Sequence, residues 1–85
     1  MPEICRFLGI IIYMVYDDHN PPHFHAVYGN FEIAVEITGG IVTGRFPRRA
    51  LAAVLEWHLM HRDELLEDWE LARRHEPLKP IVPLE

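Results

Sequence analysis

Three histidines in the segment Asp18–His25, DHNPPHFH, are the side chains of this sequence best suited to chemistry near neutral pH. An imidazole can transfer a proton or bind a transition-metal ion through a ring nitrogen. His23 and His25 are separated by one residue, so on a β-strand both side chains project from one face, with Cα atoms roughly 6.8 Å apart. What these histidines could do therefore depends on the residues that lie opposite them in a sheet.

Two glycine-containing dipeptides downstream predict the strand register. Gly29-Asn30 and Gly39-Gly40 each stand between apolar runs, and both tolerate the positive φ angles of two-residue hairpin loops. Two such loops predict a three-stranded antiparallel meander, because the loop length determines which residues are paired. One face of this meander would consist only of apolar residues and glycine, namely Phe24, Ala26, Tyr28, Phe31, Ile33, Val35, Ile37, Val42, Gly44 and Phe46.

The opposite face of the predicted meander is polar. His23 is expected directly opposite Glu36, and His25 is expected in one row with Ala34 and Arg45. Glu36 and Arg45 would then be diagonal neighbours, close enough for their side chains to meet. The register thus predicts that the histidines face a carboxylate and a guanidinium.

One hypothesis for this cluster is a metal-independent ribonuclease. A histidine and a carboxylate would exchange protons with the 2′-hydroxyl and the leaving oxygen, and an arginine would stabilise the developing charge. Two further arginines begin a predicted helix, where backbone N–H groups attract phosphate. The candidate catalytic residues are His23, His25, Glu36 and Arg45. The candidate binding residues are His19, Thr43, Arg48 and Arg49.

A second hypothesis is a metal-binding protein that uses His23 and His25, with Glu36 or His19 as a third ligand. Only two imidazoles are unambiguous ligands, whereas stable zinc sites use three or four protein ligands. We therefore expect no cofactor and less than one bound metal ion per chain. The plainest interpretation is a solvated sheet face with cross-strand ion pairs, or an interface for another chain.

The remaining elements predict a single domain, residues 1–85, of the α+β class. Phe7–Tyr16 predicts an N-terminal strand that is apolar on both faces, and such a strand favours a homodimer or heteromer. The segment after Phe46 has helical spacing, with a predicted break near His61 and His58 on its apolar stripe. The predicted fold is a four-stranded, mostly antiparallel sheet of the N-terminal strand and the meander, followed by one long broken helix or two tandem helices packed on one face.

Composition excludes several classes of function. The formal net charge is −5, so bulk electrostatics do not attract the chain to nucleic acid. Cys5 is the only cysteine, which excludes an internal disulfide and is typical of a reducing compartment. No apolar run has the length of a membrane span, and the N-terminal residues lack the pattern of a signal peptide. We expect a cytoplasmic protein.

Three segments, GIIIYMVYDDHNPPHFHAVYG, GRFPRRALAAVLEW and ELLEDWELAR, resemble a group of small bacterial proteins, the domain-of-unknown-function family 4160. The resemblance covers essentially the whole chain, and it implies no established activity. The matching motif positions are Asp18, His19, Pro21, Pro22, His23, Phe24, His25 and Tyr28. What the resemblance does imply is a gene context similar to toxin–antitoxin pairs.

The preferred hypothesis is accordingly a small cytosolic bacterial protein that acts through a protein partner. The partner would be a small protein encoded nearby, and the two would form a toxin–antitoxin-like pair. We expect a homo- or hetero-oligomer, with RNA as a possible further partner and no membrane association.

Overall fold

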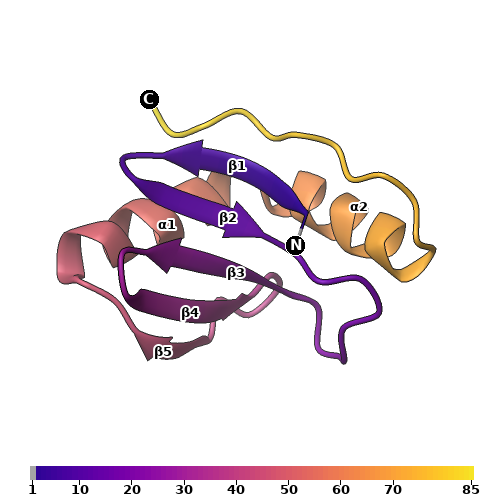
Figure 1. Cartoon of the computed structure of the whole chain (residues 1–85), viewed down its shortest axis with the longest axis horizontal. Helices are drawn as coiled ribbons and strands as arrows, with labels where there is room; N and C mark the ends of the chain where they lie inside the picture. The colour runs from indigo at the N-terminus through magenta and orange to yellow at the C-terminus, as the bar shows by residue number, and fades with distance from the viewer. Residues whose placement is uncertain (1) are drawn as a thin grey trace.

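The computed structural model, described here for residues 2–85, has an α+β architecture with five strands and two helices. The strands are antiparallel and lie side by side in chain order, β1-β2-β3-β4-β5. Their bounds are β1 Glu3–Phe7, β2 Ile10–Tyr13, β3 His23–Tyr28, β4 Phe31–Glu36 and β5 Val42–Arg45. The helices that follow are α1 Arg48–Met60 and α2 Arg62–Arg73. Figure 1 shows both helices behind the sheet, so one face of the sheet is covered and the other is open.

The predicted N-terminal strand, Phe7–Tyr16, is wrong in one respect. The chain turns at Leu8 and Gly9, which have φ angles of 52° and 78°, and forms the β1–β2 hairpin there. Leucine rarely adopts a positive φ, so its apolar side chain made the turn look like part of one continuous strand. The sheet therefore has five strands rather than four.

The predicted register of the next hairpin is confirmed. β3 pairs with β4 so that His23 lies opposite Glu36, and His25 lies opposite Ala34. The loop between the strands is the expected Gly29-Asn30 dipeptide, in which Gly29 has a φ of 59°. Both histidines consequently project from the open face of the sheet.

The predicted register of the last hairpin is wrong by two residues. Ala34 lies opposite Thr43, where Arg45 was expected. The loop contains four residues rather than two, because the amide of Glu36 donates to the carbonyl of Ile41 at 2.9 Å. A shift of two residues preserves the alternation of faces, so the apolar face of the meander keeps its composition while its polar partners change.

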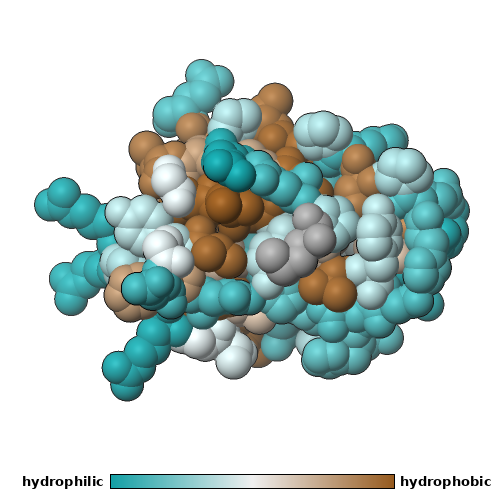
Figure 2. Space-filling view, in the orientation of Figure 1, coloured by the Kyte–Doolittle hydropathy of each residue, from teal (hydrophilic) through white to brown (hydrophobic). Residues whose placement is uncertain are grey.

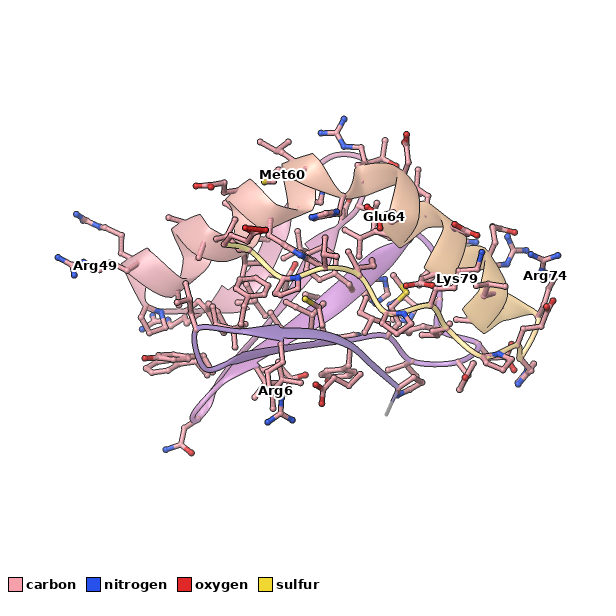
Figure 3. The ribbon with its side chains drawn as sticks, turned by 90° about the horizontal axis from the view of Figure 1, so that it is seen from above. Arg6, Arg49, Met60, Glu64, Arg74 and Lys79 are labelled. Carbon is pink, nitrogen blue, oxygen red and sulfur yellow. The ribbon has the colours of Figure 1, made fainter. Side chains whose placement is uncertain are left out.

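The core lies between the sheet and the helices. Its fully buried side chains include Phe24, Ile33, Trp57 and Leu65. The expected helix break is confirmed, since α1 ends at Met60 and α2 begins at Arg62. Figure 3, seen from above, shows both helices on one side of the sheet.

His58 is the hydrogen-bonded core histidine that its position on the helix predicted. It is buried, and its Nε2–H donates to the carbonyl of Ile37 at 2.5 Å. The C-terminal tail closes the end of the core, where the indole of Trp57 donates to the carbonyl of Val82 and the amide of Ile81 donates to that of Ile4.

The open face of the sheet is turned toward the viewer in Figure 2, where hydrophobic and hydrophilic residues are interspersed. Arg6 on β1 points away from the helices on this side (Figure 3). Within residues 2–85, neither helix has the length and apolar character required to cross a bilayer.

Candidate metal centre

The chain between β2 and β3 returns Asp18 to the first residues of β3. The Oδ2 atom of Asp18 lies 2.9 Å from His23 Nε2 and 3.3 Å from His25 Nε2. The side chain of Asp18 is 15 % exposed, and His23 is buried. Because H-x-H on a strand places both imidazoles on one face, a single carboxylate oxygen can meet both of them.

Backbone contacts determine the ring orientation of His23. Its Nδ1 lies 2.8 Å from the carbonyl oxygen of Pro21, which can only accept a hydrogen bond. Nδ1 therefore carries a proton, and Nε2 is the atom that faces Asp18. An unprotonated Nε2 at 2.9 Å from a carboxylate oxygen would set two lone pairs against each other, so this contact requires a proton or a cation between the atoms.

The carboxyl group of Asp18 is ionised under ordinary conditions. Burial raises its pKa, but hydrogen bonds from the His25 ring and the His19 amide, with the charges of His23 and His19, outweigh burial and hold the pKa below its usual value. The ring of His19 also lies beside this carboxylate, with Nδ1 3.0 Å from Oδ1, although its side chain is largely exposed. Asp18 is thus an anionic centre among three imidazoles.

Two further side chains, Tyr13 and Glu32, lie close to the ring of His25. The ring of Tyr13 stacks on it, with centroids 4.8 Å apart, and the Tyr13 hydroxyl donates to Glu32 Oε2 at 2.5 Å. Burial and the hydrogen bond to Glu32 raise the pKa of Tyr13 to about 12, so the hydroxyl remains a donor. Glu32 Oε2 in turn lies 3.7 Å from His25 Nδ1. A carboxylate oxygen therefore lies near each ring nitrogen of His25, from Asp18 at Nε2 and from Glu32 at Nδ1.

A pocket of about 240 Å³ opens above these histidines on the open face of the sheet. Most of the predicted site residues meet there. The residues that line the pocket are His19, Pro21, His23, His25, Ala34, Glu36, Ile41 and Thr43. Among these lining residues there is no lysine or arginine.

The three arginines that were candidates for the site do not line this pocket. Arg45 lies opposite Glu32, because the four-residue loop moves it two positions along β4. Its expected place in a row with His25 is therefore wrong. Arg49 lines a separate hollow with Leu8 and Tyr28, and Arg48 is the first residue of α1.

Two residues of the cluster received no role from the sequence. Asp18 was assigned only to the family motif, and Tyr13 only to an apolar strand. A spacing of five residues between Asp18 and His23 allows a loop to fold back on its own strand, but it does not require it. The sequence suggested Glu36 or His19 as a third metal ligand, whereas the structure brings Asp18 next to the two histidines.

The three side chains are spaced as metal ligands are. One ligand atom from each of Asp18, His23 and His25 lies within 4.8 Å of the others. A tetrahedral zinc ion holds nitrogen and oxygen ligands at about 2.0–2.2 Å, which places neighbouring ligand atoms roughly 3.3 Å apart. The second ring nitrogen of His23 donates to a backbone carbonyl, as that of a metal-bound histidine does. Two histidines and one carboxylate also leave coordination positions open for water or substrate.

Comparison with known proteins identifies one family. The model of that family, described as "Domain of unknown function (DUF4160)", matches residues 9–70 of the chain. The match includes Asp18, His23 and His25, together with the whole lining of the pocket. No curated protein and no solved structure matches the chain.

Proposed function

Because the chain belongs to the DUF4160 family, whose description assigns no activity, we propose a function from the site itself: the protein binds a divalent transition-metal ion. The ligands are Asp18 Oδ2, His23 Nε2 and His25 Nε2. Imidazole and carboxylate ligands suit zinc, and they also suit iron(II) where coordination positions stay open. His23 and His25 also line the pocket, so water or a substrate could reach an ion held there.

One observation carries this proposal. Both Nε2 atoms converge on one carboxylate oxygen while Nδ1 of His23 is committed to the Pro21 carbonyl. A surface ion pair needs only one imidazole and does not need a fixed tautomer. The expectation that the chain holds no metal rested on a count of two ligands, and Asp18 raises that count to three.

Metal content and affinity test the proposal directly. Tag-free protein is dialysed against EDTA, titrated with zinc by calorimetry and analysed for bound metal after desalting. We expect about one zinc ion per chain, and an affinity at least tenfold lower in Asp18→Asn and in His23→Asn. Asp17→Asn is the matched control, because Asp17 is in the same loop and pairs with His75 outside the pocket. Less than a tenth of an equivalent at micromolar zinc would refute metal binding.

The metal-independent ribonuclease is not the function that we propose. That hypothesis needs a cation beside the histidines to stabilise charge on phosphorus. The guanidinium chosen for this role, Arg45, lies opposite Glu32 instead, and the lining of the pocket contains no lysine or arginine.

A second proposal concerns a protein partner, as one half of a toxin–antitoxin-like pair. The sheet ends at β5, and no strand among residues 2–85 pairs with the outer edge of β5. Ile41, just before this edge, is 59 % exposed. Such an edge can accept a strand from another chain. The earlier argument from an N-terminal strand with two apolar faces no longer applies, because Ile10 and Ile12 on one face and Tyr13 on the other are buried within the chain itself.

Co-expression tests this second proposal. The chain is produced with the small protein encoded beside it, and the purified material is analysed by sedimentation. A one-to-one complex that is lost in Ile41→Lys would support the pair. A strict monomer that recovers no such protein would refute it.

A further inference from the structure

The pocket contains one carboxylate that the proposed metal centre does not use. Glu36 lies directly opposite His23 on the neighbouring strand and lines the same pocket. The amide of Ile37 donates to the carbonyl of Pro22, so the adjacent pair Pro22 and Ile37 is the hydrogen-bonded one. His23 and Glu36 are therefore a non-hydrogen-bonded pair, in which the side chains approach more closely.

Glu36 is also uncommitted. Within residues 2–85 its carboxylate makes no hydrogen bond and no ion pair, although the residue is only half exposed. A half-buried carboxylate without partners, on the strand next to the candidate ligand His23 and in the same pocket, can serve as a general base in metal-dependent hydrolysis.

The charge of the pocket selects the substrate. Two acidic side chains, Asp18 and Glu36, balance the charge of one divalent ion, and the lining includes no lysine or arginine to hold a phosphate. Methyl and methylene groups of Pro21, Ala34 and Ile41 form the walls. This lining suits an uncharged acyl group of about side-chain size better than a polyanion.

We propose that the site hydrolyses an uncharged carbonyl compound, an ester or an amide, with Glu36 as the general base; this inference rests on the proposed metal site. Glu36 takes a proton from a water molecule in the pocket, and a metal ion held by Asp18, His23 and His25 would supply the Lewis acid that polarises this water. The water oxygen forms a bond to the carbonyl carbon, and the bond from that carbon to the leaving oxygen or nitrogen breaks. The proton then passes from Glu36 to the leaving atom, giving a carboxylic acid and an alcohol or amine.

The experiment uses the full chain loaded with zinc and two probes. p-Nitrophenyl acetate is an uncharged ester, and bis(p-nitrophenyl) phosphate is an anionic diester. We expect zinc-dependent hydrolysis of the ester, and at most a hundredth of that rate with the diester. Glu36→Gln should lower the ester rate by about 10²-fold or more. The same variant should bind zinc within threefold of the parent affinity and melt at the same temperature, because Glu36 holds neither the metal nor the fold.

Glu56→Gln is the matched control, since Glu56 is an exposed glutamate of α1 outside the pocket, and its rate should stay within twofold of the parent. Stoichiometric zinc with equal ester rates in Glu36→Gln and the parent would overturn the role of Glu36. Stoichiometric zinc with faster hydrolysis of the diester would overturn the substrate class. Both results leave the proposed metal site intact. A failure of the parent chain to bind zinc would overturn the metal site and this inference together.

Discussion

Replacing Asp18 with asparagine separates a metal centre from an ordinary ion pair. The substitution keeps the size of the side chain and removes its charge. Without metal, the variant loses the contact of the charged Oδ2 atom with two imidazoles, which lie 2.9 and 3.3 Å away in the parent. Hydrogen bonds that involve charged groups contribute about 1.5–3 kcal/mol, and partial exposure of Asp18 lowers this to about 1–2 kcal/mol. For a chain of this length, that loss corresponds to a melting temperature roughly 5–15 °C lower.

Zinc should widen the difference in melting temperature between the parent and Asp18→Asn. At a free zinc concentration of 100 times the dissociation constant, binding to the folded state alone adds about 2.7 kcal/mol. The parent should therefore melt roughly 10–20 °C higher with zinc than with EDTA. Asp18→Asn should show at most about half of this increase at the same zinc concentration, because an affinity tenfold lower or more leaves no more than about 1.4 kcal/mol of stabilisation.

The dependence of this effect on pH has a definite sign. The pKa of Asp18 lies below its ordinary value of 3.8 in the folded state, so the carboxylate contributes stability at every pH above that value. The contribution is lost as the pH falls from 3.8 through the folded-state pKa. The difference in unfolding free energy between parent and Asp18→Asn, measured with urea in EDTA, should therefore narrow as the pH falls below about 4.

Asp17→Asn is the control for these measurements. Asp17 pairs with His75 through two side chains that are each 62 % exposed, and such a pair contributes less than about 1 kcal/mol. Equal losses in Asp17→Asn and Asp18→Asn would contradict the assignment of Asp18 to a special cluster. A zinc-induced increase of equal size in Asp18→Asn and the parent would show that the metal binds elsewhere.

Four further substitutions have distinct expected outcomes. Burial raises the pKa of the Asp68 carboxyl, so its anion destabilises the folded protein at pH 7. Asp68→Asn should therefore raise the unfolding free energy at pH 7, measured with urea, and this gain should vanish below pH 3.8. A loss of stability in the variant would contradict this. Gly44→Ala should lower the unfolding free energy by about 3 kcal/mol or more, because φ is +109° and a Cβ would stand 2.6 Å from the Glu32 carbonyl. Gly29→Ala, where a Cβ would meet nothing within 4 Å, should lower it by about 1 kcal/mol. Equal costs would show that the close approach is relieved elsewhere. Tyr13→Phe should weaken zinc binding, measured by calorimetry, about tenfold, because Glu32 loses the hydroxyl donor that orients its carboxylate near His25 Nδ1. An unchanged affinity would show that Tyr13 does not support the metal site.

The sequence was most informative where a turn and an apolar face constrained the same residues. The Gly29-Asn30 loop and the alternation after it placed His23 opposite Glu36 correctly. The helix break at His61 also followed from charge and length, because basic residues suit a helix end and acidic residues suit a start.

The second hairpin shows the limit of such reasoning. Loops of two and of four residues around Gly39-Gly40 leave the same residues on the apolar face, since they differ by one full period of the strand. Hydrophobic pattern cannot distinguish them. The polar face does distinguish them, because the shift separates Arg45 from the histidines.

Asp18 was missed for a different reason. The side chain of a loop residue has no periodicity, so neither strand nor helix spacing indicates where it points. Only the path of the loop through Pro21 and Pro22 brings Asp18 back over β3, and that path depends on packing around the loop rather than on local pattern.

The proposed ligands Asp18, His23 and His25 all lie within eight consecutive residues. A metal ion bound there would close two small chelate rings in a single stretch of backbone, and short rings cost little chain entropy. Such a site does not need the helices to bring distant segments together. Fraying of α2 or the C-terminal tail should therefore leave the ligands in reach of one another.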